Sequence, residues 1–118
     1  MHPVRCSLSY APPEVVTAHF HGKPIAVHPS ADIWALGVMA FEVLSGRRAM
    51  QSISELYLFA SGAQSYPWEA APDAAAEPWR KLRLWSLVEA CLARDPAARP
   101  TAAMVVQRVQ QTWQKTTM

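Results

Sequence analysis

The side chains of this sequence that could do chemistry are few and widely separated. His19, His21 and His28 could together bind a metal ion, but no cysteine or carboxylate lies among them, so we expect histidines of a solvated loop. The two cysteines, Cys6 and Cys91, are too few for a zinc finger or a disulfide framework. We therefore expect no metal site, and free thiols in a reducing compartment.

No motif for phosphate binding or nucleophilic catalysis is present. A loop that binds phosphate needs clustered glycines so that the backbone can approach the phosphate groups, whereas Gly22, Gly37, Gly46 and Gly62 are isolated. No G-x-S-x-G turn exposes a nucleophilic serine either. The residues give no support for catalysis by this chain alone.

The basic residues indicate an ordinary protein surface. The net charge of +2 is too small to predict a nucleic-acid or membrane partner. The only basic clusters are Arg47-Arg48 and the group formed by Arg80, Lys81 and Arg83. Short clusters of this kind are usually solvated, and the binding of a polyanion or an acidic peptide is the alternative.

The length and the apolar pattern predict one all-α domain that must position these side chains. The chain has 118 residues, 51% of them hydrophobic, which is enough for a single core. Loops are expected at residues 15–29 and 62–78, where prolines recur. Apolar spacing and capping residues predict four main helices, at residues 30–45, 52–60, 78–93 and from 101 towards the C-terminus.

The longest apolar run begins at Ile33 and ends at Phe41, about half of what a bilayer span needs. It therefore predicts a helix that is buried on nearly all sides. The first residues lack the apolar segment of a signal peptide. Together these features favour an intracellular, cytoplasmic location.

Four stretches, taken in order, resemble the C-terminal lobe of a eukaryotic protein kinase domain. They are SLSYAPPE (7–14), similar to the substrate-facing loop with its Ala-Pro-Glu motif, SADIWALGV (30–38), similar to the central buried helix, LVEACL (87–92) and RDPAARPT (94–101). Each stretch is weak alone, but all four in order with suitable gaps are a strong signal. The resemblance implies that residues 1–118 are a partial protein kinase domain, the C-terminal lobe only.

The sequence is closer to serine/threonine kinases than to tyrosine kinases at one position in particular. Leu36, beside Gly37, stands where tyrosine kinases tend to have phenylalanine. Departures from the family bear on substrate specificity more than on fold. They are Pro12, Ser7 and Cys6 in place of alanine, threonine and glycine, and residues 46–50, which lack the usual Pro-Phe.

The resemblance implies a parent domain that uses ATP and Mg²⁺ to phosphorylate serine or threonine in protein substrates. The sequence contains no asparagine, no Asp-Phe-Gly and no glycine-rich loop, so it lacks the ATP-binding and catalytic residues. We expect the chain alone to be inactive and to bind no cofactor. Its expected partners are the missing N-terminal part of the kinase domain and a protein substrate. The alternatives are a catalytically inactive pseudokinase-like protein-binding module and an unrelated helical scaffold.

The resemblance also implies roles for individual residues. Glu14 and Arg99, 85 positions apart, would form a buried ion pair that ties the substrate loop to the last helices, because the planar guanidinium can hold both carboxylate oxygens. Ser7 and Tyr10 would line the groove for the residue that follows the phosphorylated one. Without the resemblance, Glu14 and Arg99 would more simply be surface charges, and Ser7 and Tyr10 a turn serine and a packed tyrosine.

Asp32, Trp34 and Gly37 are expected in the structural core. In the family, the aspartate accepts hydrogen bonds from the backbone of the catalytic loop, which this chain lacks. Its carboxylate then either reaches water or is driven towards the protonated form. Because the same helix has apolar faces that other kinase helices cover, we expect a large exposed apolar patch and a tendency to aggregate or to need a partner.

Overall fold

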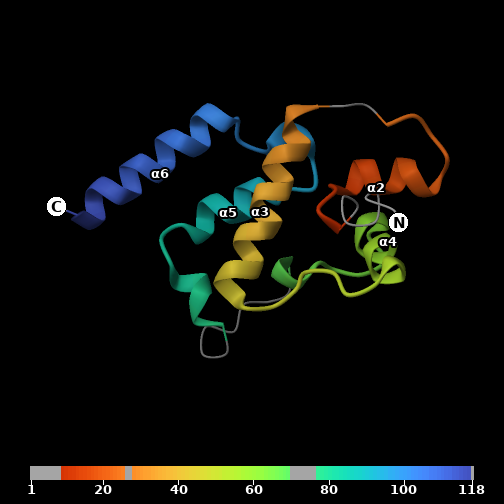
Figure 1. Cartoon of the computed structure of the whole chain (residues 1–118), viewed down its shortest axis with the longest axis horizontal. Coiled ribbons are helices and arrows are strands. Elements are labelled where there is room, and N and C mark those ends of the chain that lie inside the picture. Colours follow the sequence, from red (N-terminus) through yellow and green to blue (C-terminus); the bar gives the residue numbers. More distant parts are fainter. Residues whose placement is uncertain (1–8, 26–27, 70–76, 118) are drawn as a thin grey trace, which may run out of the picture.

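The computed structural model describes residues 9–25, 28–69 and 77–117, which contain helices and no strand. The all-α fold class expected from the sequence is therefore confirmed. Five α-helices lie within these ranges: α2 (Pro13–Phe20), α3 (Pro29–Ser45), α4 (Ile53–Ser61), α5 (Trp85–Cys91) and α6 (Ala102–Thr117). Three short 3-10 helices join them: η1 (Pro67–Glu69), η2 (Pro78–Lys81) and η3 (Pro96–Ala98). Figure 1 shows α3 running through the middle of the molecule beside α5, with α2 and α4 side by side at one end.

Helix α3 is the longest element and has well-defined ends. It starts at a proline in its first position, and the N-cap is His28, whose Nδ1 accepts a hydrogen bond from the Ser30 backbone N–H at 3.1 Å. The sequence predicted that this helix begins at residue 30, one residue after its observed start. The helix ends at Gly46, whose φ of 71° lies in the left-handed region that glycine adopts without a steric penalty.

One side of α3 forms the centre of the core. Trp34, Val38 and Phe41 are completely buried. Gly37 lies where α5 comes close, and a Cβ built there would be 2.9 Å from the Leu92 Cγ. The glycine is therefore needed for this close helix approach, and Gly37 and Trp34 are both buried.

Aromatic rings fill most of this core. The rings of Tyr66 and Trp68 stack at 4.8 Å between centroids, and Trp34 meets both edge-on. Phe41 packs against Trp68 and Trp79. Such edge-to-face and offset pairs add to the stabilisation that burial of apolar area provides.

Two segments differ from the sequence-based expectation. Residues 13–20, expected as a turn and a loop, form α2, because Pro13 suits the first turn of a helix and Val16 is buried against the core. Residues 78–93, expected as one helix, divide into η2 and α5, since Leu82 between them is extended, with φ −69° and ψ 143°. Trp79 and Trp85 are thereby both buried.

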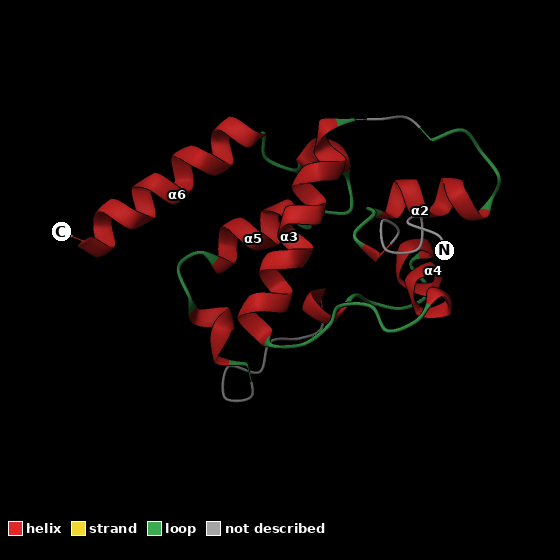
Figure 2. Ribbon diagram, in the orientation of Figure 1, coloured by secondary structure: helices red, strands yellow, loops and turns green. Residues whose placement is uncertain are grey.

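Helix α6 projects away from the rest of the molecule (Figures 1 and 2). Val105, near its start, is buried with Ile33, Leu87 and Cys91. The side chains that follow are mostly exposed, including Trp113. No helix in the described ranges has both the length and the apolar character that a membrane span requires.

Candidate functional site

The structure brings Glu14 and Arg99 together in a two-point ion pair. Arg99 donates from Nη1 to the Glu14 Oε2 and from Nη2 to the Glu14 Oε1, both at 2.8 Å. The Arg99 side chain is 0% exposed and the Glu14 side chain 36% exposed. The arginine is thus the buried partner of this pair, which we call the Glu14–Arg99 clasp, and the glutamate still touches solvent.

Arg99 also binds the backbone at three further points. It donates from Nε to the Ala93 carbonyl at 2.8 Å, from Nη1 to the Ser30 carbonyl at 3.3 Å and from Nη2 to the Arg94 carbonyl at 3.2 Å. Its guanidinium carbon lies 5.1 Å from the centre of the Trp34 ring. One side chain therefore joins the start of α2, the start of α3 and the connection between α5 and α6.

A second carboxylate holds the segment that precedes α2. Glu42, near the end of α3, accepts a hydrogen bond from the Tyr10 hydroxyl on Oε1 at 2.8 Å and from the Ala49 backbone N–H on Oε2 at 3.0 Å. It thereby fixes Tyr10 against the connection between α3 and α4. Tyr10 is partly buried, and Ser7, its expected companion in the groove, lies outside the described residues.

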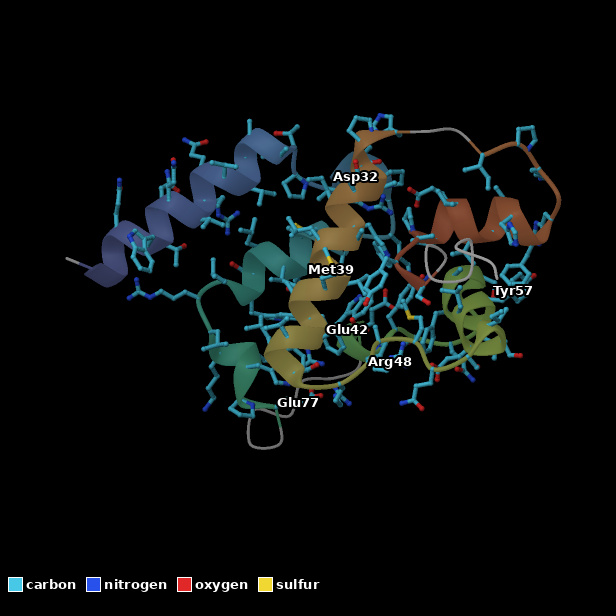
Figure 3. The ribbon with its side chains drawn as sticks, viewed as in Figure 1. Asp32, Met39, Glu42, Arg48, Tyr57 and Glu77 are labelled. Atoms are coloured by element: carbon cyan, nitrogen blue, oxygen red, sulfur yellow. The ribbon has the colours of Figure 1, made fainter. Side chains whose placement is uncertain are left out.

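Asp32 does not lie in the core with Trp34 and Gly37; of the alternatives that the sequence left open, its carboxylate is the one that reaches water. It is exposed in the first turn of α3, where its charge is favourable at the positive end of the helix dipole. Leu36, Met39 and Val43, which are 43, 47 and 82% exposed, follow it at helical spacing. Figure 3 shows Asp32 and Met39 along this helix. We call these four residues the open face of α3, since each is exposed in the described part of the chain.

A second arginine clasp was missed by sequence reasoning. Arg94 donates from Nε to the Glu69 Oε2 at 2.8 Å and from Nη2 to the Glu69 Oε1 at 2.9 Å. It also caps the end of α4 by donating from Nη1 to the Phe59 carbonyl at 2.8 Å, and it lies over the Tyr66 ring. We call this the Glu69–Arg94 clasp. No local sequence pattern links Glu69 and Arg94, because they lie 25 positions apart in the chain.

Most residues of the basic clusters are exposed, as the sequence indicated, but Arg80 is not. Glu77 binds both Arg47, at 2.6 Å, and Arg80, at 2.7 Å. The Arg80 guanidinium packs on the Trp79 ring, 4.7 Å from its centre, and its side chain is almost fully buried. Arg47 lies in the connection that follows α3, and Glu77 lies directly before η2. Their pairing therefore depends on the path of the chain and not on local sequence.

Burial changes the protonation of two interior groups. It raises the pKa of the Tyr66 hydroxyl well above its usual value, and it raises the pKa of the Cys91 thiol. Both groups therefore stay neutral at pH 7, and Cys91 is a packing residue and not a reactive thiolate.

The histidines have local contacts. The His21 Nε2 lies 3.3 Å from the Tyr57 hydroxyl, and His28 caps α3. Across residues 9–25, 28–69 and 77–117, no three histidine, cysteine, aspartate or glutamate side chains are grouped so that they could hold a metal ion.

A family model described as the protein kinase domain matches residues 1–113. The chain belongs to the protein kinase domain family. Its relatives include an Aurora kinase of Dictyostelium discoideum, 29% identical over 103 residues, and the serine/threonine-protein kinase Nek9 of Xenopus laevis, 31% identical over 88 residues. A third is mitogen-activated protein kinase kinase kinase 10 of Xenopus laevis, 27% identical over 97 residues.

These alignments cover most of this chain but little of each relative. They take in 85, 75 and 82% of the chain, and 23, 9 and 9% of the Aurora kinase, Nek9 and the kinase kinase kinase respectively. The chain therefore spans at most about a quarter of the length of these kinases. The relationship agrees with the serine/threonine type that Leu36 and Gly37 had suggested.

Proposed function

We propose that residues 1–118 are the C-terminal-lobe part of a serine/threonine protein kinase domain. The complete domain would transfer the γ-phosphate of ATP to serine or threonine in protein substrates. The observation that carries the proposal is the Glu14–Arg99 clasp, since it joins the Ala-Pro-Glu-like turn to the end of the lobe across 85 positions. In an unrelated helical scaffold two charges 85 positions apart would more simply be separate surface residues.

In this proposal the chain supplies the substrate side of the kinase. Tyr10 is held in place by Glu42, and Ser7 and Tyr10 would face the residue that follows the phosphorylated one. The Glu14–Arg99 clasp keeps this segment anchored on the lobe. Such positioning matters because phosphoryl transfer depends on holding the two reacting oxygens in line.

The residues of this chain do not fit an ATP–Mg²⁺ site. Magnesium in kinases is held by aspartate and asparagine, and the sequence has no asparagine. Within the described ranges, no three histidine, cysteine, aspartate or glutamate side chains are grouped so that they could hold a metal ion. ATP, Mg²⁺ and the catalytic aspartate would therefore belong to a preceding part of the complete domain, and we derive no catalytic step for this chain.

That preceding part is also the proposed partner of the open face of α3. Leu36, Met39 and Val43 present apolar side chains to solvent on one side of α3, and a contiguous exposed apolar patch can mark an interface. Asp32, at the end of the same stripe, could accept backbone hydrogen bonds from the covering segment. The polar and apolar residues of the face would then both find partners.

The test is to map the 5′ end of the natural transcript and to express the whole protein that it encodes. We expect an in-frame catalytic His-Arg-Asp loop with its asparagine and an Asp-Phe-Gly, and transfer of labelled γ-phosphate to serine or threonine in casein. Replacing the catalytic aspartate by alanine is the control and should abolish transfer.

The 118-residue chain alone should bind no ATP in a fluorescent-nucleotide titration. An upstream frame without these motifs would contradict the kinase proposal. It would instead favour the second candidate, a protein-binding module of the pseudokinase type. Arg48, which is exposed and has no carboxylate partner among the described residues, is the observation that supports this second candidate.

A further inference from the structure

A small cavity lies beside the segment that holds Tyr10. Its volume is about 150 Å³, and it lies between Ser9, the connection from α3 to α4, and the first turn of α4. Met50 and Leu56 form its apolar wall, and Arg48 and Ser52 provide polar groups. The cavity is large enough for one side chain of a bound peptide.

Arg48 differs from the other arginines near the core. Arg47, Arg80, Arg94 and Arg99 each bind a glutamate at 2.6–2.8 Å. Arg48 is exposed, and no carboxylate of a described residue lies within ion-pair distance of its guanidinium.

No carboxylate is among the residues that line the cavity, and the two glutamates of the adjoining segments, Glu42 and Glu55, are hydrogen-bonded elsewhere. Both oxygens of Glu42 accept hydrogen bonds, from Tyr10 and from the backbone of Ala49. Glu55 accepts one from the Gln51 backbone N–H at 2.8 Å as part of the N-terminal cap of α4. Arg48 is the only charged residue among those that line the cavity, and it lies next to the positive end of α4.

We propose that this cavity binds an anionic side chain of the protein substrate, with Arg48 as the specificity-determining residue. The inference rests on the proposed function, because it assumes that the segment containing Tyr10 faces a peptide. A guanidinium binds a carboxylate or a phosphate through two parallel hydrogen bonds, so aspartate, glutamate and a phosphorylated residue share the required chemistry. Residues 46–50 lack the family's usual Pro-Phe. They contain Arg48 instead, which lines the cavity.

The test is fluorescence anisotropy of labelled peptides with the 118-residue chain. Three peptides carry the same serine-centred sequence with flanking glutamate, glutamine or phosphoserine. We expect the glutamate peptide to bind at least about fivefold more tightly than the glutamine peptide, and the phosphoserine arm to show whether phosphate is preferred over carboxylate. Arg48→Ala should remove this difference, and Arg48→Lys should restore only part of it because lysine lacks the planar fork.

The matched control is Arg83→Ala, since Arg83 is also an exposed arginine but lies before α5, outside the cavity. Both positions are exposed, so far-UV circular dichroism should be the same for all variants. Equal weakening by Arg48→Ala and Arg83→Ala would overturn the inference, as would equal affinity for the glutamate and glutamine peptides or no binding at 1 mM, a concentration of the order of weak peptide affinities. Each of these results would leave the phosphotransfer test of the proposed function untouched, so the two failures are distinguishable.

Discussion

The Glu14–Arg99 and Glu69–Arg94 clasps use the same two-point chemistry in different surroundings. In the first, the Arg99 side chain is 0% exposed and its partner is 85 positions away. In the second, the Arg94 and Glu69 side chains are 34 and 28% exposed and 25 positions apart. The comparison teaches that the bonding pattern alone does not set the stability that a clasp provides, because water competes with the second clasp and not with the buried guanidinium of the first.

The largest effect is expected from breaking the buried clasp. Glu14→Ala leaves the Arg99 guanidinium buried without a counter-ion, and Arg99→Ala leaves carbonyl groups without a donor. Each variant should lower the free energy of unfolding by about 3–5 kcal/mol. Urea unfolding followed by circular dichroism measures this. Glu89→Ala, at an exposed position of α5, is the control and should leave the midpoint unchanged.

A smaller loss is expected from Arg94→Ala. The Glu69–Arg94 clasp is partly solvated, but Arg94 also caps the end of α4 through the Phe59 carbonyl, so we expect a loss of about 1–2 kcal/mol. The same urea titration should rank this variant between Arg99→Ala and Arg83→Ala. Equal midpoints for Arg94→Ala and Arg99→Ala would show that burial does not distinguish the two clasps.

The Tyr66 ring packs against the Arg94 guanidinium of the Glu69–Arg94 clasp. Ionisation of the Tyr66 hydroxyl at high pH therefore tests how strongly this part of the core is buried. Burial raises the pKa of the Tyr66 hydroxyl, so the folded state keeps the proton when the unfolded chain ionises near pH 10. Below pH 10 the hydroxyl is neutral in both states, so the free energy of unfolding does not depend on its ionisation. Above pH 10 only the unfolded chain ionises, so the free energy of unfolding declines as the pH rises towards the folded-state pKa.

At pH 11 this decline amounts to about 1.4 kcal/mol. We expect Tyr66→Phe to remove that part of the loss of stability between pH 8 and pH 11, as measured by urea unfolding at both values. An unchanged alkaline loss in Tyr66→Phe would mean that Tyr66 ionises as readily in the folded protein as in the unfolded chain.

The smallest effect on folding is expected on the open face of α3. Asp32→Asn and Met39→Lys change exposed side chains, so the free energy of unfolding should move by no more than about 0.5 kcal/mol. Met39→Lys should nevertheless reduce self-association of the chain in size-exclusion chromatography with light scattering, since it interrupts the apolar stripe. A parent chain that is already monodisperse and monomeric would contradict the role given to this face.

Much of the fold could be predicted from local sequence signals. The apolar run of α3, its end at Gly46 and the cap of α4 at Ser52 depend on residues within a few positions of one another. Helix α2 was missed because the double proline looked like a turn, although Pro13 fits the first position of a helix. The Glu14–Arg99 clasp was expected only through the resemblance to kinases, since no local pattern links residues so far apart.

The amino-acid sequence by itself determined the all-helical class, the most apolar helix and the kinase relationship, because periodicity, caps and motifs are written in neighbouring residues. Only the tertiary structure decided that Arg94 pairs with Glu69, that the Glu14 side chain stays partly exposed while Arg99 is buried, and that Asp32 faces solvent. The reason is physical: pairing and burial depend on which distant segments the chain path brings together, and desolvation then sets the strength of each contact.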